Sequence, residues 1–212
     1  MTERWTFGVE PLPQQRELAA LLRRVASLAL ALEQEDPALD RLITELDASA
    51  AALAAVAPAD NAPRLGADAP PEQRVYIDHA RDIGAFNPAF PEYRITVDGN
   101  RATGTVTFPL LFEGPPGIVH GGMLATFFDS VMQQHNCDAG VAGKTTSLLV
   151  EYKRPTPVGV ALTFTIEREP KERRITSRGQ LVADDAVLCI ATMEAIAGDV
   201  TNLPPVSPRR ES

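Results

Sequence analysis

The segment GIVHGGMLATFFDSV, residues 117–131, contains the residue types that acyl-transfer chemistry needs. Gly121 and Gly122 would begin a helix and leave its first backbone N–H groups open to a carbonyl or phosphate oxygen, since these groups lack partners within the helix. Asp129 lies nine positions after His120 and is the only charged residue in the apolar run 123–132. A carboxylate there can attack a carbonyl or activate a water. The spacing therefore indicates an oxyanion-type site with an acid two to three helical turns further on.

Both features also have a purely structural explanation. Two glycines before a helix often form only a tight turn, and a single aspartate on a helix often forms a salt bridge or faces water. The apolar neighbours of Asp129 favour a functional role, because burying an unpaired carboxylate is costly. On physical grounds alone, both explanations stay open.

The elements expected around this segment form an antiparallel α+β domain. Alternating apolar and polar residues predict strands at 93–97, 101–108, 145–153, 160–168, 173–183 and 186–196. Asp98-Gly99 is expected to supply the central residues of the first hairpin turn, and Asp184-Asp185 the tip of the last. The connections between the last four strands are too short for βαβ crossovers, so antiparallel pairing is expected. A long helix beginning near Gly121 would pack against this curled sheet.

Composition divides the chain into four parts. In residues 1–57, Leu, Val and Ile recur every three or four positions, which predicts an N-terminal hairpin of two amphipathic helices. Residues 58–71 are rich in Pro, Ala, Asp and Gly and are expected to be a linker. The main domain is expected at 72–197, followed by a disordered tail at 198–212. The spacing leaves open whether the helical hairpin contacts the main domain or a partner subunit.

Composition also narrows the partners and the location. The chain has 212 residues, a net charge of −8 and a pI near 4.9, which argues against a nucleic-acid partner. A few local basic residues could still bind a phosphate-bearing small molecule. Cys137 and Cys189 are too few for a disulfide framework and have no metal-ligand spacing. Without a signal peptide or a transmembrane stretch, a cytoplasmic location and no membrane partner are expected.

Three other segments support a family assignment when taken with the helix. They are FNPAFP at 86–91, FEGPPGI at 112–118 and TTSLLVEYKRPTP at 145–157. Together with VHGGMLATFFD they resemble the hotdog-fold acyl-CoA thioesterases of the phenylacetate-pathway (PaaI-like) branch, over residues 84–197. His-Gly-Gly alone is weak evidence, but the aspartate nine positions later and a strand of the form T-x-x-L-x-x-x-Y-x-R-P make the resemblance specific. It implies an α+β hotdog fold, in which a curved antiparallel sheet wraps a long helix, here with an N-terminal helical extension.

The resemblance also implies an activity, namely hydrolysis of acyl-CoA thioesters to free acid and coenzyme A without a cofactor or metal ion. Asp129 falls on the catalytic carboxylate of the family, which acts as nucleophile or as general base. The Gly121 backbone N–H would polarise the thioester carbonyl, and His120 would orient the thioester or its loop. Thr145 falls on the hydroxyl residue that positions the attacking water in some relatives.

Further substrate contacts are implied next to these residues, at Gly122, Thr146, Ser147, Lys153 and Arg154. The hydroxyls at 146 and 147 are close enough to Thr145 to leave its assignment open by a residue. Lys153 and Arg154 are candidates for the phosphates of coenzyme A, with Arg173 and Arg174 as a second candidate pair. Exposed basic residues mostly serve solubility, so either pair has ordinary surface charge as its alternative explanation. The chain has Glu113-Gly114 where many relatives carry an asparagine.

In this fold the site generally forms between two subunits, so the resemblance implies a homodimer or homotetramer. His120 and Gly121 would come from one chain and Asp129 from its neighbour. One alternative is a hotdog hydratase or dehydratase, which needs an Asp and a His at a short fixed spacing on the helix. Asp129 and His135 are six positions apart and about 240° apart in rotation, which disfavours it. The other alternative is a non-catalytic acyl-CoA-binding or regulatory module, for which a pairing of Asp129 with Thr145 would be unnecessary.

Overall fold

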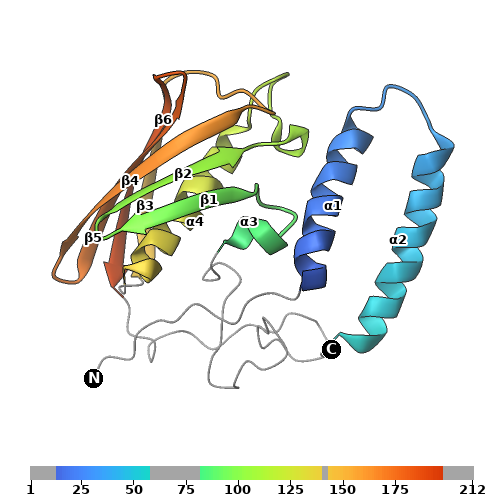
Figure 1. The fold of residues 1–212 in the computed structure, drawn as a ribbon, viewed down its shortest axis with the longest axis horizontal. Coiled ribbons are helices and arrows are strands. Elements are labelled where there is room, and N and C mark those ends of the chain that lie inside the picture. The colour runs from blue at the N-terminus through green and yellow to red at the C-terminus, as the bar shows by residue number, and fades with distance from the viewer. Residues whose placement is uncertain (1–12, 58–81, 140–142, 198–212) are drawn as a thin grey trace.

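The computed structural model describes residues 13–57, 82–139 and 143–197, and in these a long helix lies against one face of a six-stranded antiparallel sheet (Figure 1). The expected linker at 58–71 and tail at 198–212 lie outside the described residues. The predicted domain boundaries therefore stay predictions. None of the described helices combines the length and the apolar character that a membrane span requires.

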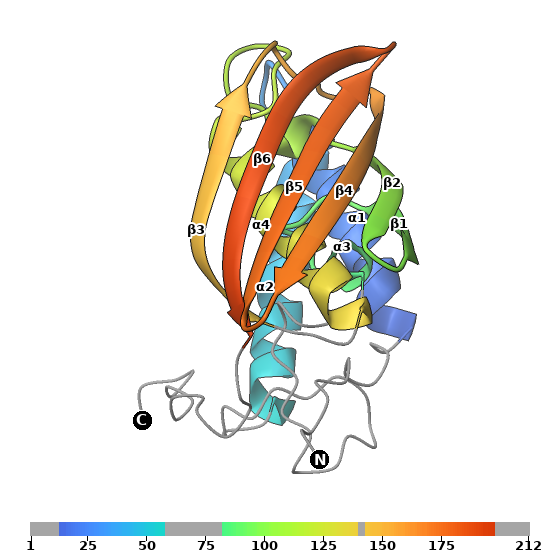
Figure 2. The same cartoon turned by 90° about the vertical axis from the view of Figure 1, so that its left-hand side faces the viewer.

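The strands occur where the alternation of apolar and polar residues predicts them. They are β1 (Tyr93–Asp98), β2 (Arg101–Thr107), β3 (Gly143–Tyr152), β4 (Ala161–Lys171), β5 (Arg174–Ala183) and β6 (Ala186–Ala197). The order across the sheet is β1-β2-β4-β5-β6-β3, and every neighbouring pair is antiparallel. Figure 2 shows β3 at the edge of the sheet beside β6. The strand with the T-x-x-L-x-x-x-Y-x-R-P pattern is thus an edge strand.

The helix α4 (Gly121–Asp138) packs its aromatic and aliphatic face on the sheet. Phe127 is fully buried, and its ring contacts five others, those of Phe90, Tyr93, Phe108, Phe128 and Phe164. Gly179 of β5 allows the helix to come close, because a Cβ there would lie 2.7 Å from Met132 Cε. This packing fixes the distance of α4 from the sheet and its rotation about its own axis. It therefore also fixes the direction in which the polar side chains of α4 point.

The first hairpin turn lies one residue later than the sequence analysis places it. Asp98 pairs with Arg101, so the central residues are Gly99 and Asn100, and the prediction of Asp98-Gly99 was wrong. Of these two only Gly99 has a positive φ, 56°, which is the pattern of a type II′ turn. Asp98 stays in the ladder because this turn needs its glycine at the first central position.

The helix α1 (Pro13–Leu30) is bound to the main domain of its own chain. It packs on two short helices that the sequence analysis did not predict, α3 (Ile83–Phe86) and the 3-10 helix η2 (Leu110–Phe112). Arg23 of α1 is buried, and its Nη1 donates to the carbonyl oxygens of Asn87 at 3.0 Å and Phe90 at 3.3 Å. The Leu111 N–H donates to Ser27 Oγ at 3.3 Å. Polar contacts thus fix α1 in place.

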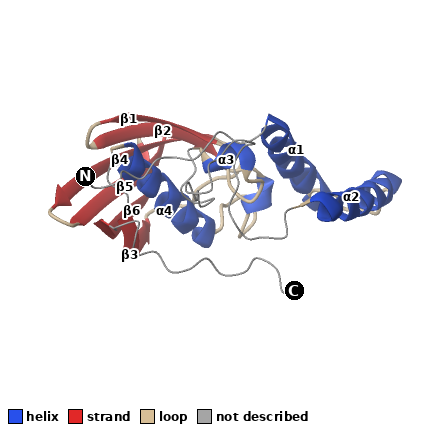
Figure 3. Cartoon of the chain, turned by 90° about the horizontal axis from the view of Figure 1, so that it is seen from below, coloured by secondary structure: helices blue, strands red, loops and turns tan. Residues whose placement is uncertain are grey.

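The helix α2 (Pro37–Val56) follows α1 and lies on its far side from the sheet (Figure 3). Asp36 caps it, with Oδ1 accepting from the Ala38 N–H at 2.7 Å, and Pro37 occupies its first position. α2 has no buried residue in this single subunit, and Ile43, Leu46 and Leu53 are exposed. Among the described residues, the helical extension is docked on the main domain chiefly through α1.

Candidate active site

Asp129 is hydrogen-bonded to Thr145 on the neighbouring edge strand. Thr145 Oγ1 donates to Asp129 Oδ1 at 2.7 Å, and the Gln133 Nε2 amide donates to the same Thr145 oxygen, also at 2.7 Å. Asp129 and Gln133 lie one turn apart on α4 and so share a face. Gln133 was not among the predicted site residues, although its position four residues after the acid is a signal that could have found it. The three side chains form a chain of hydrogen bonds between α4 and β3.

A β-bulge decides which of three consecutive hydroxyl residues contacts Asp129. Leu148 and Val150 pack against the core, so undisturbed alternation would turn Thr146 inward. The register of β3 against β6 shifts between Thr145 and Ser147, however, and Thr146 is the extra residue of the bulge. Thr145 therefore faces α4, while the exposed Thr146 hydroxyl donates to a backbone carbonyl of β6 at 3.0 Å.

At the N-terminus of α4, the His120 ring makes a capping hydrogen bond, whereas the Gly121 N–H group makes none to the described residues. His120 is the N-cap, and its Nδ1 accepts from the Gly122 N–H at 3.0 Å. Because Nδ1 accepts, a neutral His120 ring carries its proton on Nε2. The Gly121 N–H has no acceptor among the described residues, whereas the Gly122 N–H is occupied by the ring. Gly121 thus supplies the open donor at this helix end, and the dipole adds partial positive charge.

Tyr152, at the end of β3, stands over this helix terminus. Its hydroxyl donates to the Gly121 carbonyl oxygen at 2.9 Å. A Cβ on Gly121 would lie 3.1 Å from Tyr152 Cζ, so the ring also explains why this position suits glycine. Although Tyr152 belongs to the strand pattern, the sequence analysis gave it no role.

The open donor and the acid do not converge in one subunit. Gly121 and Asp129 are eight residues apart on a straight helix, which corresponds to about 12 Å along its axis. One thioester carbonyl cannot contact both groups of the same chain. The chain thus holds two candidate half-sites, one at Gly121 and one at Asp129, at different points along the α4–β3 contact.

Comparison with known proteins places this geometry in a fold. No family model matches the chain. Acyl-coenzyme A thioesterase THEM4 from Xenopus laevis is 35% identical over 78 residues, which are 36% of this chain and 35% of THEM4. The chain thus spans about a third of the length of this curated relative.

A solved structure described as a thioesterase superfamily protein is 28% identical, with a TM-score of 0.67, over 90% of this chain and 100% of the other. The chain has the hotdog fold. A hypothetical thioesterase from Streptococcus pneumoniae, solved with coenzyme A, is 20% identical over 51% of this chain and 90% of its own, with a TM-score of 0.48.

The two candidate basic pairs lie at opposite ends of the hotdog sheet. The backbone N–H groups of Lys153 and Arg154 both donate to Leu188, near the start of β6, at the end of β3 that carries Tyr152. Arg174 pairs with Ile196, at the other end of β6. Lys153 Nζ lies 2.8 Å from Glu151 Oε1, and this hydrogen bond and charge lower the pKa of the Glu151 carboxyl. Only the first pair thus shares an end of the sheet with the open Gly121 donor.

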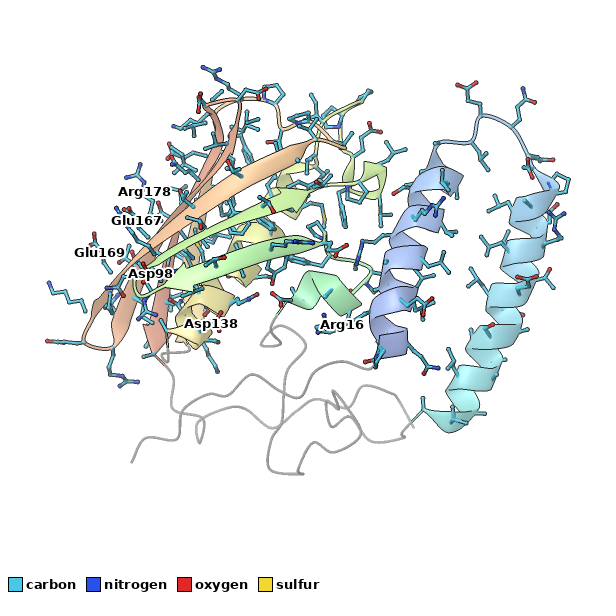
Figure 4. The ribbon with its side chains drawn as sticks, in the orientation of Figure 1. Arg16, Asp98, Asp138, Glu167, Glu169 and Arg178 are labelled. Atoms are coloured by element: carbon cyan, nitrogen blue, oxygen red, sulfur yellow. The ribbon has the colours of Figure 1, made fainter. Side chains whose placement is uncertain are left out.

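His135 is far from the acid despite being on the same helix. Its ring is fully buried, and Nε2 lies 3.0 Å from the Gly99 carbonyl oxygen in the β1–β2 turn. β3, which contacts Asp129, is at the opposite edge of the hotdog sheet. Burial lowers the pKa of His135, with Asp138 at the end of α4 (Figure 4) acting in the other direction. No group of three or more His, Cys, Asp or Glu side chains suited to a metal occurs in the described part of the chain.

Proposed function

We propose that this protein hydrolyses acyl-CoA thioesters to free acid and coenzyme A, as a PaaI-like hotdog thioesterase. The hydrogen bond from Thr145 to Asp129 is the observation that carries the proposal, because it joins an acid to a hydroxyl that can hold a water beside it. The similarity to THEM4 and to a thioesterase superfamily protein supports the reaction class. The position of His135, bonded to the β1–β2 turn, speaks against a hydratase that would pair it with Asp129.

The catalytic roles follow from the donors and acceptors of the two half-sites. The Gly121 N–H donates to the thioester oxygen and stabilises the negative charge that develops on it. Acting as a general base, Asp129 takes a proton from a water as that water attacks the carbonyl carbon, and the C–S bond then breaks to release coenzyme A. Acting as a nucleophile, Asp129 would instead form an acyl anhydride that water hydrolyses. The Thr145 oxygen, whose proton goes to Asp129, retains a lone pair that can hold the water in either route.

The separation of about 12 Å between Gly121 and Asp129 supports a homodimer, or a homotetramer of two dimers, as the active form. Gly121 of one subunit would then complete the site at Asp129 of the other. β3 is an edge strand, and its residues Leu149 and Tyr152 are 62% and 56% exposed. An exposed edge strand of this kind is open to pairing with a second copy.

Arg154 is our candidate for the phosphates of coenzyme A, with Lys153 as a second contact. Arg154 is exposed, and its side chain has no acidic partner among the described residues, whereas the Lys153 ammonium is already paired with Glu151. Arginine binds phosphate oxygens through two parallel N–H donors, which suits a terminal phosphate. Both residues follow Tyr152 at the end of β3 that lies beside the Gly121 donor of α4.

The first experiment measures release of free coenzyme A thiol from short, long and aromatic acyl-CoAs. Asp129→Asn keeps the shape of the side chain and removes its charge, so turnover should fall by roughly a hundredfold or more. Asp185→Asn is the matched control, since this exposed residue at the β5–β6 tip has a positive φ that asparagine also adopts. No turnover on any substrate, with acyl-CoA still bound, would contradict the hydrolase and favour the binding module.

A further inference from the structure

Gln133 makes the Thr145 hydroxyl part of a directed chain of hydrogen bonds. Its Nε2 and Asp129 Oδ1 each lie 2.7 Å from Thr145 Oγ1, one on each side. A hydroxyl has a single proton, and an ionised carboxylate can only accept. Thr145 Oγ1 also lies 3.6 Å from Met193 Sδ, which is only a weak acceptor. The carboxylate is the stronger acceptor, so the proton of Thr145 points to Asp129 and Gln133 bonds the same oxygen by donating to it.

This direction also fixes the amide of Gln133. If its oxygen faced Thr145, two acceptors would compete for one hydroxyl proton, and the bond to Asp129 would be lost for part of the time. With Nε2 facing Thr145, Oε1 points away, is buried and has no partner among the described residues. A buried amide oxygen without a partner costs free energy, and the bond from Nε2 to Thr145 offsets part of this cost. The bond to Thr145 is the interaction that holds it.

We propose that Gln133 is a positioning residue for the hydrolysis proposed above, and the inference rests on that function. By donating to Thr145, Gln133 keeps the threonine proton on Asp129 Oδ1. The second carboxylate oxygen, Oδ2, is then the atom that meets the water or the acyl carbon. One lone pair of Thr145 is occupied by the amide and one stays open to the water, so the hydroxyl can bind the water in a single arrangement. Gln133 itself does not touch the substrate.

The position of Gln133 agrees with a role exerted through Thr145. It is nine-tenths buried, on the turn of α4 that follows Asp129, and its amide donates to Thr145. The next residue, Gln134, is also buried but belongs to a different network. Its Oε1 accepts from the Tyr93 hydroxyl, and its Nε2 donates to Asp82 Oδ1 at 3.2 Å. Two adjacent glutamines thus allow a comparison of the same chemical change inside and outside the proposed site.

The test is a double-mutant cycle with steady-state kinetics on the best acyl-CoA of the panel. Gln133→Met keeps the length of the side chain and removes the amide, so kcat should fall roughly three- to tenfold while KM changes less than about twofold. Thr145→Val should lower kcat further. Because Gln133 acts only through Thr145, adding Gln133→Met to Thr145→Val should change kcat by less than about twofold. Gln134→Met is the control and should leave kcat unchanged.

Gln133→Glu provides a second variant of nearly the same shape. Its carboxylate cannot donate to Thr145 and competes for the hydroxyl proton, so kcat should fall below that of Gln133→Met. Thermal unfolding of each variant verifies that it folds. Independent, multiplying losses in the double mutant, or an unchanged kcat in Gln133→Met, would overturn the positioning role while leaving the hydrolase standing. Absence of wild-type turnover would overturn the proposed function itself, and this inference with it.

Discussion

The Tyr152 hydroxyl donates to the Gly121 carbonyl oxygen at 2.9 Å, which ties the end of β3 to the first turn of α4. Seven residues earlier on the same strand, Thr145 is bonded to Asp129. One strand therefore contacts both candidate half-sites, and a shift of β3 would move the helix N-terminus and the acid together. In the proposed hydrolase, β3 thus contributes more than the Thr145 hydroxyl.

Loss of the Tyr152 hydroxyl should weaken turnover without unfolding the protein. Tyr152→Phe keeps the ring over Gly121 and removes the bond to its carbonyl oxygen. A neutral hydrogen bond contributes about 0.5–1.5 kcal/mol, so we expect kcat/KM to fall roughly two- to tenfold. Steady-state kinetics on the preferred acyl-CoA measures this change in kcat/KM. Tyr93→Phe is not a suitable control, because Tyr93 belongs to the hydrophobic core. An unchanged kcat/KM would show that ring packing alone orders this helix end.

Protonation of His135 should destabilise the fold in acid. Burial lowers the pKa of His135 in the folded protein, so between that value and the unfolded pKa of about 6.5 the unfolded state binds more protons. Stability from this residue is therefore complete above about pH 6.5 and declines as the pH falls below it. Urea unfolding measures the slope of the free energy of unfolding against pH between about 5.5 and 8. This window lies above the usual carboxyl pKa values. His135→Gln should flatten that slope, and an equal slope in both proteins would assign it to other groups.

Arg23 should be the residue that holds the helical extension on the main domain. It is buried and donates to two backbone carbonyl oxygens, whereas the adjacent Arg24 is exposed. Arg23→Met leaves those carbonyls without a donor, which should release α1 and raise the hydrogen exchange of its amides. Arg24→Met is the matched control and should exchange like the wild type. Equal exchange in both variants would mean that apolar packing of α1 suffices for docking.

The sequence predicts the elements of the fold well because their signals are local. Period-two alternation marks each strand, and Asp184-Asp185 forms the hairpin tip as expected, with φ values of 44° and 63°. The order of the strands has no such signal. β3 follows α4 in the chain but pairs with β6, a contact set by packing over the whole sheet. The one-residue error at Gly99 arises because Asp98-Gly99 and Gly99-Asn100 are both good turn pairs.

At the candidate site, residue types were predictable and exact partners were not. Asp129 was singled out by its apolar neighbours, and the roles of Asp129 and Gly121 in catalysis stay predictions. The choice among Thr145, Thr146 and Ser147 depends on a bulge, which a count along the strand cannot locate. Gln133 was not predicted because polar residues on helices are common. Its spacing of four from Asp129 indicates a shared face, and the structure adds its bond to Thr145.

The edge position of β3 has a consequence for the order in which this protein acquires its site. β3 joins the sheet through β6, and Thr145 pairs with Ala195, fifty residues further along the chain. Closing so long a loop costs more chain entropy than forming a local hairpin such as β5–β6, so we expect this pairing to form after that hairpin. A nascent chain that ends before β6 already contains Asp129 but has no neighbouring strand to hold Thr145 against it. The last strand of the sheet to be synthesised therefore brings the acid and its hydroxyl together.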